Sequence, residues 1–377
     1  SITMIENGEL DEGNDNDLKE WDELCNNVGN GSISYDEFCK KVDVQGFIDY
    51  FASQIYWCNA DWPQKNYTVW RSDAIDESNP YADGKWRMAM FDTESGQGLY
   101  GSQDKSFSAD QFKRIRESNC QLSKLFNGLI NSQEFRYQFT RTMMDLSNQN
   151  FAADRTKEVI DFYKNSYSQQ ISDTFARFYS RSMSGDNAAR HFKEALNTVT
   201  EFYSKRPSYA ERTTRSAMKI SSEPHTLSIK NNSNSGSIDL NTLKLGDISS
   251  WSGNYHSDYE LDLTAKPVEG KYFAYWNING AEITDGDIYS ASVSLKLTSD
   301  ATVEAVYGDG SKPAVITTAA VTTAKTTAAA TVTTTVHSNN KSGKKYVSKV
   351  IEAENFDIKS GVDNENCSEG GLDTAYI

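Results

Sequence analysis

The sequence predicts a multidomain α+β protein, because its residue pattern changes three times along the 377 residues. Residues 1 to 218 show helical periodicity and many aromatic side chains, whereas residues 225 to 309 alternate apolar and polar positions as strands do. Residues 310 to 344 are a Thr- and Ala-rich segment that cannot bury a core. A new β pattern occupies residues 345 to 377, and we expect it to be the start of a β-sandwich module.

The charge of the chain excludes some classes of partner. It has 53 Asp and Glu residues against 38 Lys and Arg residues, a formal net charge of −15. A nucleic-acid backbone selects basic protein surfaces, and so does an anionic membrane, so we expect neither as a partner. No apolar stretch is long enough for a transmembrane helix, and the N-terminus has no signal-peptide pattern. We expect both ends to be cut from a longer protein, so the missing signal leaves the compartment open.

Apolar residues at spacings of three and four predict several helices in the first region. Asn131 and Glu134 resemble a capping box, which places the start of one helix at Asn131. Pro207 should end the last helix at Arg206, since proline removes a helical hydrogen bond. We expect all of these stripes to pack in a core. The stripes run from Leu122 to Ile130, Phe135 to Leu146, Val159 to Ile171 and Phe192 to Phe202.

A β hairpin is predicted upstream of these helices. Residues 67–71 and 85–92 alternate as strands, and the segment between them is rich in Asn, Pro, Asp and Gly. A helix with the sequence IDYFASQIYW leads into the hairpin, and the segment TESGQG leaves it. The ends of the two strands should therefore lie close together.

Oxygen-bearing side chains stand at this end of the hairpin. Asp61 and Asn66 precede the first strand, and Asp92 ends the second. The spacing Asp-x-x-x-x-Asn is that of the protein-kinase catalytic loop, in which the Asp orients the attacking hydroxyl and the Asn binds magnesium. Hard cations such as magnesium prefer oxygen ligands. The alternative is that Asp61 is a cap or turn residue and Asp92 a turn residue.

Longer runs carry a family resemblance. They are VDVQGFIDYFASQIYWCNADWPQKNYTVWR, GKWRMAMFDTESG, LFNGLINSQEFRYQFTRTMMDLSNQNF and the closing FYSKRP. Together they resemble the C-terminal half of a CotH-type kinase, over roughly residues 18 to 215. CotH-type kinases are atypical protein kinases of bacterial spore coats and of secreted cellulosomal proteins. The resemblance implies a truncated kinase-like domain with a mainly helical lobe.

The same resemblance implies roles for four residues, with Mg and ATP as cofactors. Asp61 is the catalytic or metal-proximal Asp, whereas Asn66 and Asp92 bind the cofactor and magnesium. Glu94 stands where the family usually has a second Asp, and we expect it to be a further magnesium ligand. Phe91 replaces the more usual Trp or Tyr of the family.

One departure from the family concerns its nucleotide-binding lobe, which precedes the matching region together with the Lys that anchors the phosphates. Lys19, Lys40 and Lys41 lie upstream of the predicted site, but none has the strand context of that Lys. Positioning of ATP should fail without it. We therefore expect the parent protein to act on protein hydroxyls and this fragment to be inactive.

A second candidate metal site is an EF-hand loop from Asn26 to Glu37. Gly31 occupies loop position six and Glu37 position twelve, but position three is Val28 and only one ligand is charged. The competing interpretation is an ordinary turn that opens a helix near Tyr35. The acidic stretch from Glu6 to Glu23 is expected to be a solvated face or loop.

The β region at residues 225–309 resembles an internalin-B-type or bacterial immunoglobulin-like repeat, on the run YELDLTAKPVEGKYFAYWNINGAEI. We expect an antiparallel spacer domain without chemistry, in which Tyr275 and Trp276 are core residues. The Thr-rich segment that follows is expected to be an extended extracellular linker.

The segment from residue 345 resembles the opening of a carbohydrate-binding module of families six and thirty-five. The start Ile-Glu-Ala-Glu-Asn carries this resemblance. It implies that Glu352 and Glu354 bind a structural calcium ion, and two carboxylates at i and i+2 share one side of a strand. Tyr376 is a candidate for stacking on a sugar ring.

Two functions remain open from the sequence. The first is a secreted multimodular kinase-like protein, targeted to plant cell-wall polysaccharide by the terminal module and acting on an unknown protein substrate. The alternative is a non-catalytic polysaccharide-binding, cell-surface or cellulosome scaffold. Both place the protein outside the cell.

Overall fold

The computed structural model describes residues 1–178, 185–232, 234–311, 366–367 and 374–375. The chain forms one compact unit, Ser1–Ile316, and a second, Thr317–Ile377. Within the first unit, one hydrophobic core is built mainly by helices and ends at Ile220, and a second is built mainly by strands from Leu227 onward. A mainly helical core followed by a mainly β core confirms the prediction of a multidomain α+β protein. None of the described helices combines the length and apolarity needed to cross a bilayer.

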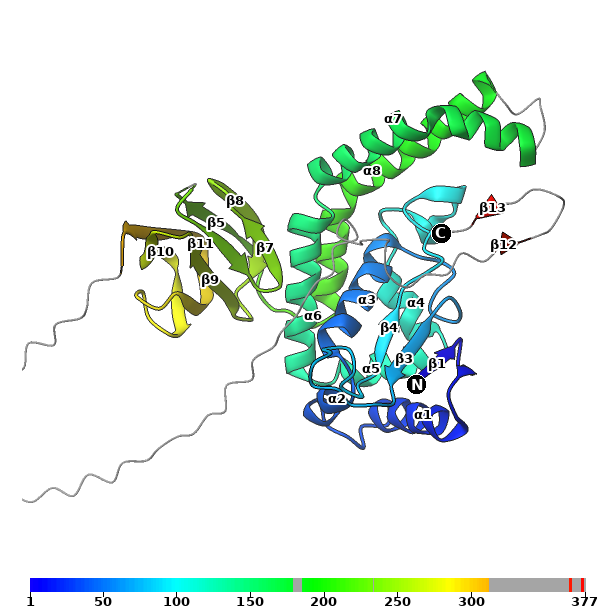
Figure 1. The fold of residues 1–377 in the computed structure, drawn as a ribbon, viewed down its shortest axis with the longest axis horizontal. Coiled ribbons are helices and arrows are strands. Elements are labelled where there is room, and N and C mark those ends of the chain that lie inside the picture. The colour runs from blue at the N-terminus through cyan, green and yellow to red at the C-terminus, as the bar shows by residue number, and fades with distance from the viewer. Residues whose placement is uncertain (179–184, 233, 312–365, 368–373, 376–377) are drawn as a thin grey trace, which may run out of the picture. The chain divides into compact units, whose positions relative to one another are not determined.

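The elements follow one another along the chain as drawn in Figure 1. The N-terminal half has β1 (Ile2–Glu6), β2 (Glu9–Glu12), α1 (Asp15–Gly29), α2 (Tyr35–Lys41), α3 (Val44–Trp57), β3 (Thr68–Ser72), β4 (Arg87–Ala89), η1 (Leu99–Gly101), η2 (Gln103–Lys105), α4 (Gln111–Glu117), α5 (Gln121–Leu129), α6 (Gln133–Asp145) and η3 (Leu146–Asn150). The long helices α7 (Ala153–Phe178) and α8 (Asp186–Ala217) follow. The strands after them are β5 (Pro224–Asn231), β6 (Gly236–Leu240), β7 (Leu243–Gly246), β8 (Ser250–His256), β9 (Leu261–Pro267), β10 (Lys271–Asp285), β11 (Ser292–Asp309), β12 (Asn366–Cys367) and β13 (Thr374–Ala375).

The predicted hairpin is present as β3 and β4, but it belongs to a four-stranded sheet of order β2-β1-β3-β4. Strands β1 and β2 were not predicted from the sequence. Asn7 and Gly8 connect these two strands with φ angles of 52° and 86°, values that favour Asn-Gly in tight hairpin turns. This dipeptide between two short strands was the signal that could have revealed them.

Two helix boundaries differ from the prediction. Helix α6 is capped by Ser132, one residue after Asn131, and the Ser132 hydroxyl accepts a hydrogen bond from the Phe135 amide at 3.3 Å. Helix α8 passes through Pro207 and ends only at Ala217. Its later turns bury Ala210 and Thr214. Burial of this face outweighs the hydrogen bond that Pro207 removes.

The prediction that every apolar stripe packs in the core was wrong for α7. Val159, Phe162, Tyr163 and Tyr167 are 47 to 63% exposed, and Tyr163 and Tyr167 stack on each other. Periodicity shows that a helix has an apolar face, but a protein covers that face only where another element packs against it. In the described residues, α7 contacts mainly α8.

The β region was predicted to be antiparallel, but its sheet is mixed. The strand order is β7-β6-β9-β11-β5-β8, with β10 paired to β11, and β5 runs parallel to β11. Alternation reveals which residues face the core and not the direction of a neighbouring strand. Trp276 is buried as expected, whereas Tyr275 is 41% exposed, because adjacent strand residues point to opposite faces.

Polar contacts join α6 and η3 to the strands of the β region. The Asp145 carboxyl is buried and accepts hydrogen bonds from the Tyr255 hydroxyl at 2.6 Å and the Asn241 amide at 2.8 Å. Burial raises the pKa of Asp145 to about 7. Beside it, the Trp251 indole donates to Gln149 at 2.8 Å. The helical and β regions of the first unit therefore share a polar boundary.

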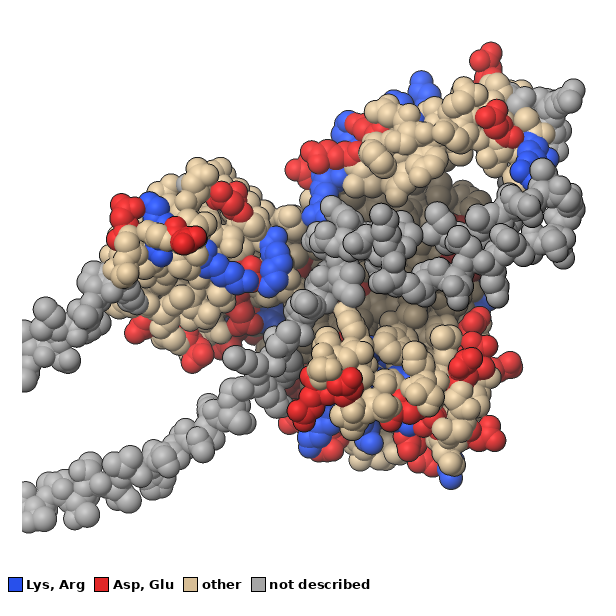
Figure 2. All heavy atoms as spheres, in the orientation of Figure 1, with Lys and Arg blue, Asp and Glu red and all other residues tan. Residues whose placement is uncertain are grey.

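The EF-hand hypothesis does not fit the structure. Helix α1 continues to Gly29, so Asn26 and Val28 are helical residues and cannot belong to a calcium loop. The competing interpretation holds, since Ser34 caps α2 at Tyr35. Figure 2 shows acidic side chains gathered on the surface over the N-terminal strands and α1. Asp17 is an exception in this stretch, because it is buried and paired with Arg71.

Candidate functional site

Helix α3 carries the chain into the candidate site. Most of its residues are buried, so tertiary packing fixes its axis. It ends at Cys58, a left-handed residue with φ 55° whose amide bonds to the carbonyls of Gln54 and Ile55. This cap turns the chain sharply, and the turn that contains Asp61 follows directly.

A second segment runs beside this turn. The Ala60 amide donates to the Ser95 carbonyl at 2.8 Å, and the Gln97 amide donates to the Trp57 carbonyl at 2.8 Å. Between these bonds lies Gly96, where a Cβ would stand 2.5 Å from the Trp57 carbonyl oxygen. Only glycine allows so close an approach. The two segments that carry Asp61 and Asp92 are thus held side by side.

Asn59 joins the two segments through its side chain, which is fully buried. Its Oδ1 accepts from the Asp61 amide at 3.1 Å, and its Nδ2 donates to the Asp92 carbonyl at 3.4 Å and to Gln54 Oε1 at 2.8 Å. Asn59 was not predicted from the sequence as a site residue. Its position two residues before Asp61, in a turn rich in polar residues, was the available signal.

Two arginines bond to the end of α3 and to the turn that follows it. Arg114 donates from Nε to the Trp62 carbonyl at 2.9 Å and also bonds to the Ala60 carbonyl. Arg206, fully buried on α8, donates to the carbonyls of Ile55, Tyr56, Phe107 and Ala109 at 2.8 to 3.0 Å. Four carbonyl groups share one guanidinium, so α8 fixes the end of α3.

Asn66 lies at the same end of the β3–β4 hairpin as Asp92. In the strand register Thr68 faces Ala89, so Asn66 and Phe91 stand two residues beyond this pair on the two strands. Asn66 is buried, and its Nδ2 has no hydrogen-bond partner among the described residues. A buried amide nitrogen without a partner is available to donate a hydrogen bond to a ligand.

The predicted site residues differ in exposure. The Asp61 side chain is 45% exposed and has Lys65 4.0 Å away. Asp92 and Glu94 are exposed, and Asp92 has a φ angle of 53°. The structure therefore brings the segments of Asp61, Asn66, Asp92 and Glu94 to one end of the hairpin. The predicted calcium ligands Glu352 and Glu354 lie outside the described residues, as does Tyr376.

The donor set fits one kind of magnesium site. No group of three His, Cys, Asp or Glu residues that could hold a metal is found in the part of the chain that the structure describes. Magnesium commonly binds through one or two carboxylates and completes its shell with water and substrate phosphates. Asp92, Glu94 and the Asn66 amide oxygen suit such a shared site and do not suit a closed protein cage.

Comparison with protein families gives a match over residues 3–210 to the family described as CotH kinase protein. The chain belongs to the CotH kinase family. The match covers the candidate site and most of α8, and it shows a kinase-like protein. A search of curated proteins finds no match.

The CotH family assignment applies to the helical region and the hairpin. The lysines upstream of the site lie on helices in this CotH chain: Lys19 is on α1, and Lys40 and Lys41 are on α2. Lys40 contacts Glu37. None of these three has the strand position of the phosphate-anchoring Lys, in agreement with the sequence analysis.

Proposed function

We propose that the CotH domain supports Mg-ATP-dependent phosphoryl transfer to hydroxyl groups of proteins. The observation that carries the proposal is the pairing of the Asp61 turn with the Asp92 segment through Asn59, Ala60 and Gly96. Phosphoryl transfer depends mainly on the positioning of charged and polar groups, and these contacts provide it.

Each site residue has a proposed role. Asp61 accepts the proton of the attacking hydroxyl, whose oxygen forms the new bond to the γ-phosphorus while the bond to the ADP oxygen breaks. Asp92, Glu94 and Asn66 supply oxygen ligands for magnesium. Magnesium, when bound, neutralises charge on the phosphates. The negative net charge of the chain suits a basic protein substrate.

The test is phosphate transfer from labelled Mg-ATP to the protein itself and to a basic protein. It is run in parallel on residues 1–377, for which we expect no transfer, and on the full reading frame, for which we expect transfer. Asp92→Ala and Asp61→Ala should each abolish transfer, and Asp11→Ala, an exposed acid on β2, should leave it unchanged. Transfer that survives both site variants would refute the assignment of the site. No transfer by the full reading frame would favour a scaffold.

We further propose that the protein is secreted and that its last segment binds plant polysaccharide, with the β region as a spacer. The support is the sequence Ile-Glu-Ala-Glu-Asn at residues 351–355 and the Thr-rich segment before it. A C-terminally complete chain that lacks residues 1–310 should be retained on insoluble xylan or cellulose. Loss of retention by Glu352→Ala or Glu354→Ala would support their calcium role.

A further inference from the structure

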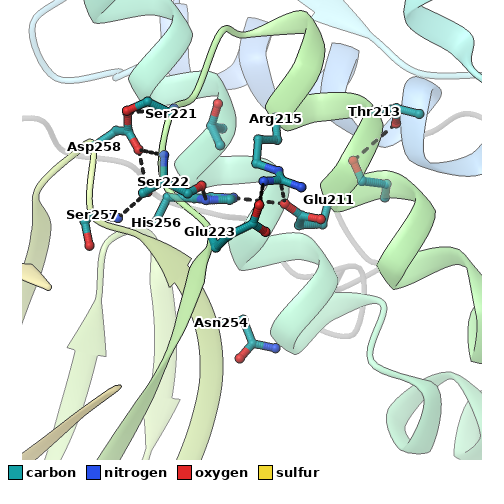
Figure 3. A network of polar contacts seen from close by, with 12 residues as sticks. Glu211, Thr213, Arg215, Ser221, Ser222, Glu223, Asn254, His256, Ser257 and Asp258 are labelled. Carbon is teal, nitrogen blue, oxygen red and sulfur yellow. Dashed lines mark hydrogen bonds and ion pairs between the residues drawn. The ribbon is translucent and has the colours of Figure 1, made fainter. Parts of the chain in front are cut away.

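A buried titratable pair lies at the junction of α8 and β8, outside the candidate site. His256, the last residue of β8, is fully buried, and its Nε2 is 3.5 Å from Oε1 of Glu211 on α8. Figure 3 shows the imidazole pointing from the strand toward the Glu211 carboxyl. Both side chains are held where each faces the other.

The backbone determines which nitrogen of His256 carries a hydrogen. Nδ1 lies 2.9 Å from the carbonyl oxygen of Ser222. Because a carbonyl oxygen can only accept, Nδ1 must be the donor in this bond. A neutral His256 ring therefore presents a lone pair at Nε2, toward Glu211.

Glu211 also directs a hydrogen-bond acceptor toward this contact. An ionised carboxylate only accepts hydrogen bonds, so two acceptors would face each other without a hydrogen between them. Neither Nε2 of His256 nor Oε1 of Glu211 has a hydrogen-bond partner among the residues that the structure describes. Arg215 Nε is 3.0 Å from the same Glu211 oxygen as an ion pair, without hydrogen-bond geometry. One added proton would satisfy both atoms.

We propose that Glu211 and His256 share a single proton, and that this proton fastens the end of β8 to α8. In the first arrangement a neutral carboxyl donates to Nε2, and in the second an imidazolium donates to the carboxylate. Burial favours the first, because it raises the pKa of Glu211 and lowers the pKa of His256.

The charged groups around the pair also have partners outside it. On α8, Arg215 bonds to Glu223 of the connection to β5, and the Arg215 and Arg212 charges oppose the effect of burial on the Glu211 pKa. After β8, Asp258 accepts from the amides and hydroxyls of Ser221 and Ser222, which lower its pKa to about 2.

The ring of Tyr259 packs against the imidazole at a centroid distance of 6.2 Å, and its hydroxyl oxygen accepts from the His256 amide. The Asp258 carboxylate and the Tyr259 hydroxyl are thus occupied by donors other than the His256 ring. Because Nε2 of His256 has no hydrogen-bond partner among the described residues, neither group donates to it, and a hydrogen between Nε2 and Glu211 must come from the pair itself.

The sign of the pH dependence follows from these pKa shifts. The raised pKa of Glu211 gives stability that is complete below its unfolded pKa and is lost as pH rises through the folded value. The lowered pKa of His256 gives stability that is present above its unfolded pKa and is lost as pH falls through the folded value. The junction is therefore strongest while the pair holds one proton, and it weakens on both sides.

The experiment uses the whole chain with ¹⁵N-labelled histidine and the variant Glu211→Gln, with Glu194→Gln as control. A glutamine amide can donate to Nε2 of His256 without titrating, whereas Glu194 is an exposed α8 residue near His191. Asp145→Asn is added to every protein, because Asp145 also titrates near neutral pH. Ring-nitrogen shifts and thermal unfolding midpoints are measured from pH 5 to 9.

At a pH below that at which the pair loses its proton, Nδ1 of His256 should carry a hydrogen and Nε2 should be hydrogen-bonded. As pH rises further, Nε2 should lose this hydrogen bond. In Glu211→Gln the Nε2 signal should stay constant on the alkaline side. Between pH 6 and 9, the thermal unfolding midpoint of Glu211→Gln should fall by about 3 °C less than that of the Glu194→Gln control. A His256 ring protonated only on Nε2, or a Glu211→Gln profile identical to the control, would refute the proposal.

Discussion

The acidic residues of the candidate site and those at the boundary with the β region have opposite environments. Asp61, Asp92 and Glu94 are partly or fully exposed at the end of a hairpin. Asp145 is buried and Glu211 largely so, and burial raises the pKa of both. An exposed carboxylate can bind a cation, whereas burial favours the protonated form of a carboxyl group, in Glu211 against the opposing charge of Arg215. Environment decides the chemistry that the same residue type performs.

The largest expected effect on stability concerns Arg206, which supports the helix that leads into the exposed site. Arg206→Ala removes the donor from four carbonyl groups, three of them in buried contacts, and should lower the free energy of unfolding by about 3 to 5 kcal/mol. Lys205→Ala, next to it but exposed, is the matched control and should change stability by about 0.5 kcal/mol or less. Denaturant unfolding measures both, and equal losses would show that Arg206 does not hold α3.

Asp145 tests the buried side of the comparison. Its pKa of about 7 lies above the ordinary value of 3.8, so its stabilisation is complete below pH 3.8 and is lost as pH rises through 7. The loss should approach about 1.4 kcal/mol per pH unit in that interval. Asp145→Asn should flatten this slope relative to wild type.

Asp262→Asn, at an exposed carboxylate that pairs with Arg141 on the same boundary, is the control for this slope. Denaturant unfolding at pH 5, 6, 7 and 8 compares the three proteins. Parallel curves for wild type and Asp145→Asn would contradict a protonated Asp145.

The sequence predicted the parts of the fold that depend on local pattern. Helix α3, the β3–β4 hairpin and the position of Asp61 and Asp92 at its open end follow from periodicity and turn residues. The course of α8 through Pro207 and the exposed face of α7 could not be predicted in this way, because both depend on which distant element packs against the helix. Asn59 was missed because its role arises from contacts 33 residues apart in sequence.

Asn59 links the two segments of the site, and its substitution should have an intermediate effect on stability. Asn59→Ala should cost about 1 to 3 kcal/mol, since the buried Gln54 side chain loses its partner. Asn59→Asp keeps an acceptor for the Asp61 amide but loses the donor to Asp92. If the site binds phosphate-bound magnesium, both variants should weaken Mn²⁺-ATP binding measured by electron paramagnetic resonance.

The stability of each Asn59 variant, measured by denaturant unfolding, serves as its reference. Variants that bind Mn²⁺-ATP as wild type does, although less stable, would limit Asn59 to a structural role.

The smallest stability effect is expected at Asp92 itself. Asp92→Asn keeps the size of an exposed side chain, so the free energy of unfolding should change by no more than about 0.5 kcal/mol. In the full reading frame, binding of Mn²⁺-ATP should nevertheless be lost. A strong destabilisation would mean that Asp92 is a structural turn residue, the alternative raised by the sequence.

The bonds of Arg206 also have a mechanical consequence. Helix α8 leads through residues 218–223 into β5. Tension applied to the chain beyond β5 therefore enters the helical region along α8 and through the contacts of α6 and η3 with the β strands. On the α8 path it reaches Arg206 before it reaches α3. Because this guanidinium bonds to four carbonyl groups, the load on α8 is divided between the C-terminal end of α3 and residues 107–109. A pull on the chain beyond β5 is therefore spread over several backbone segments before it reaches the turn that carries Asp61.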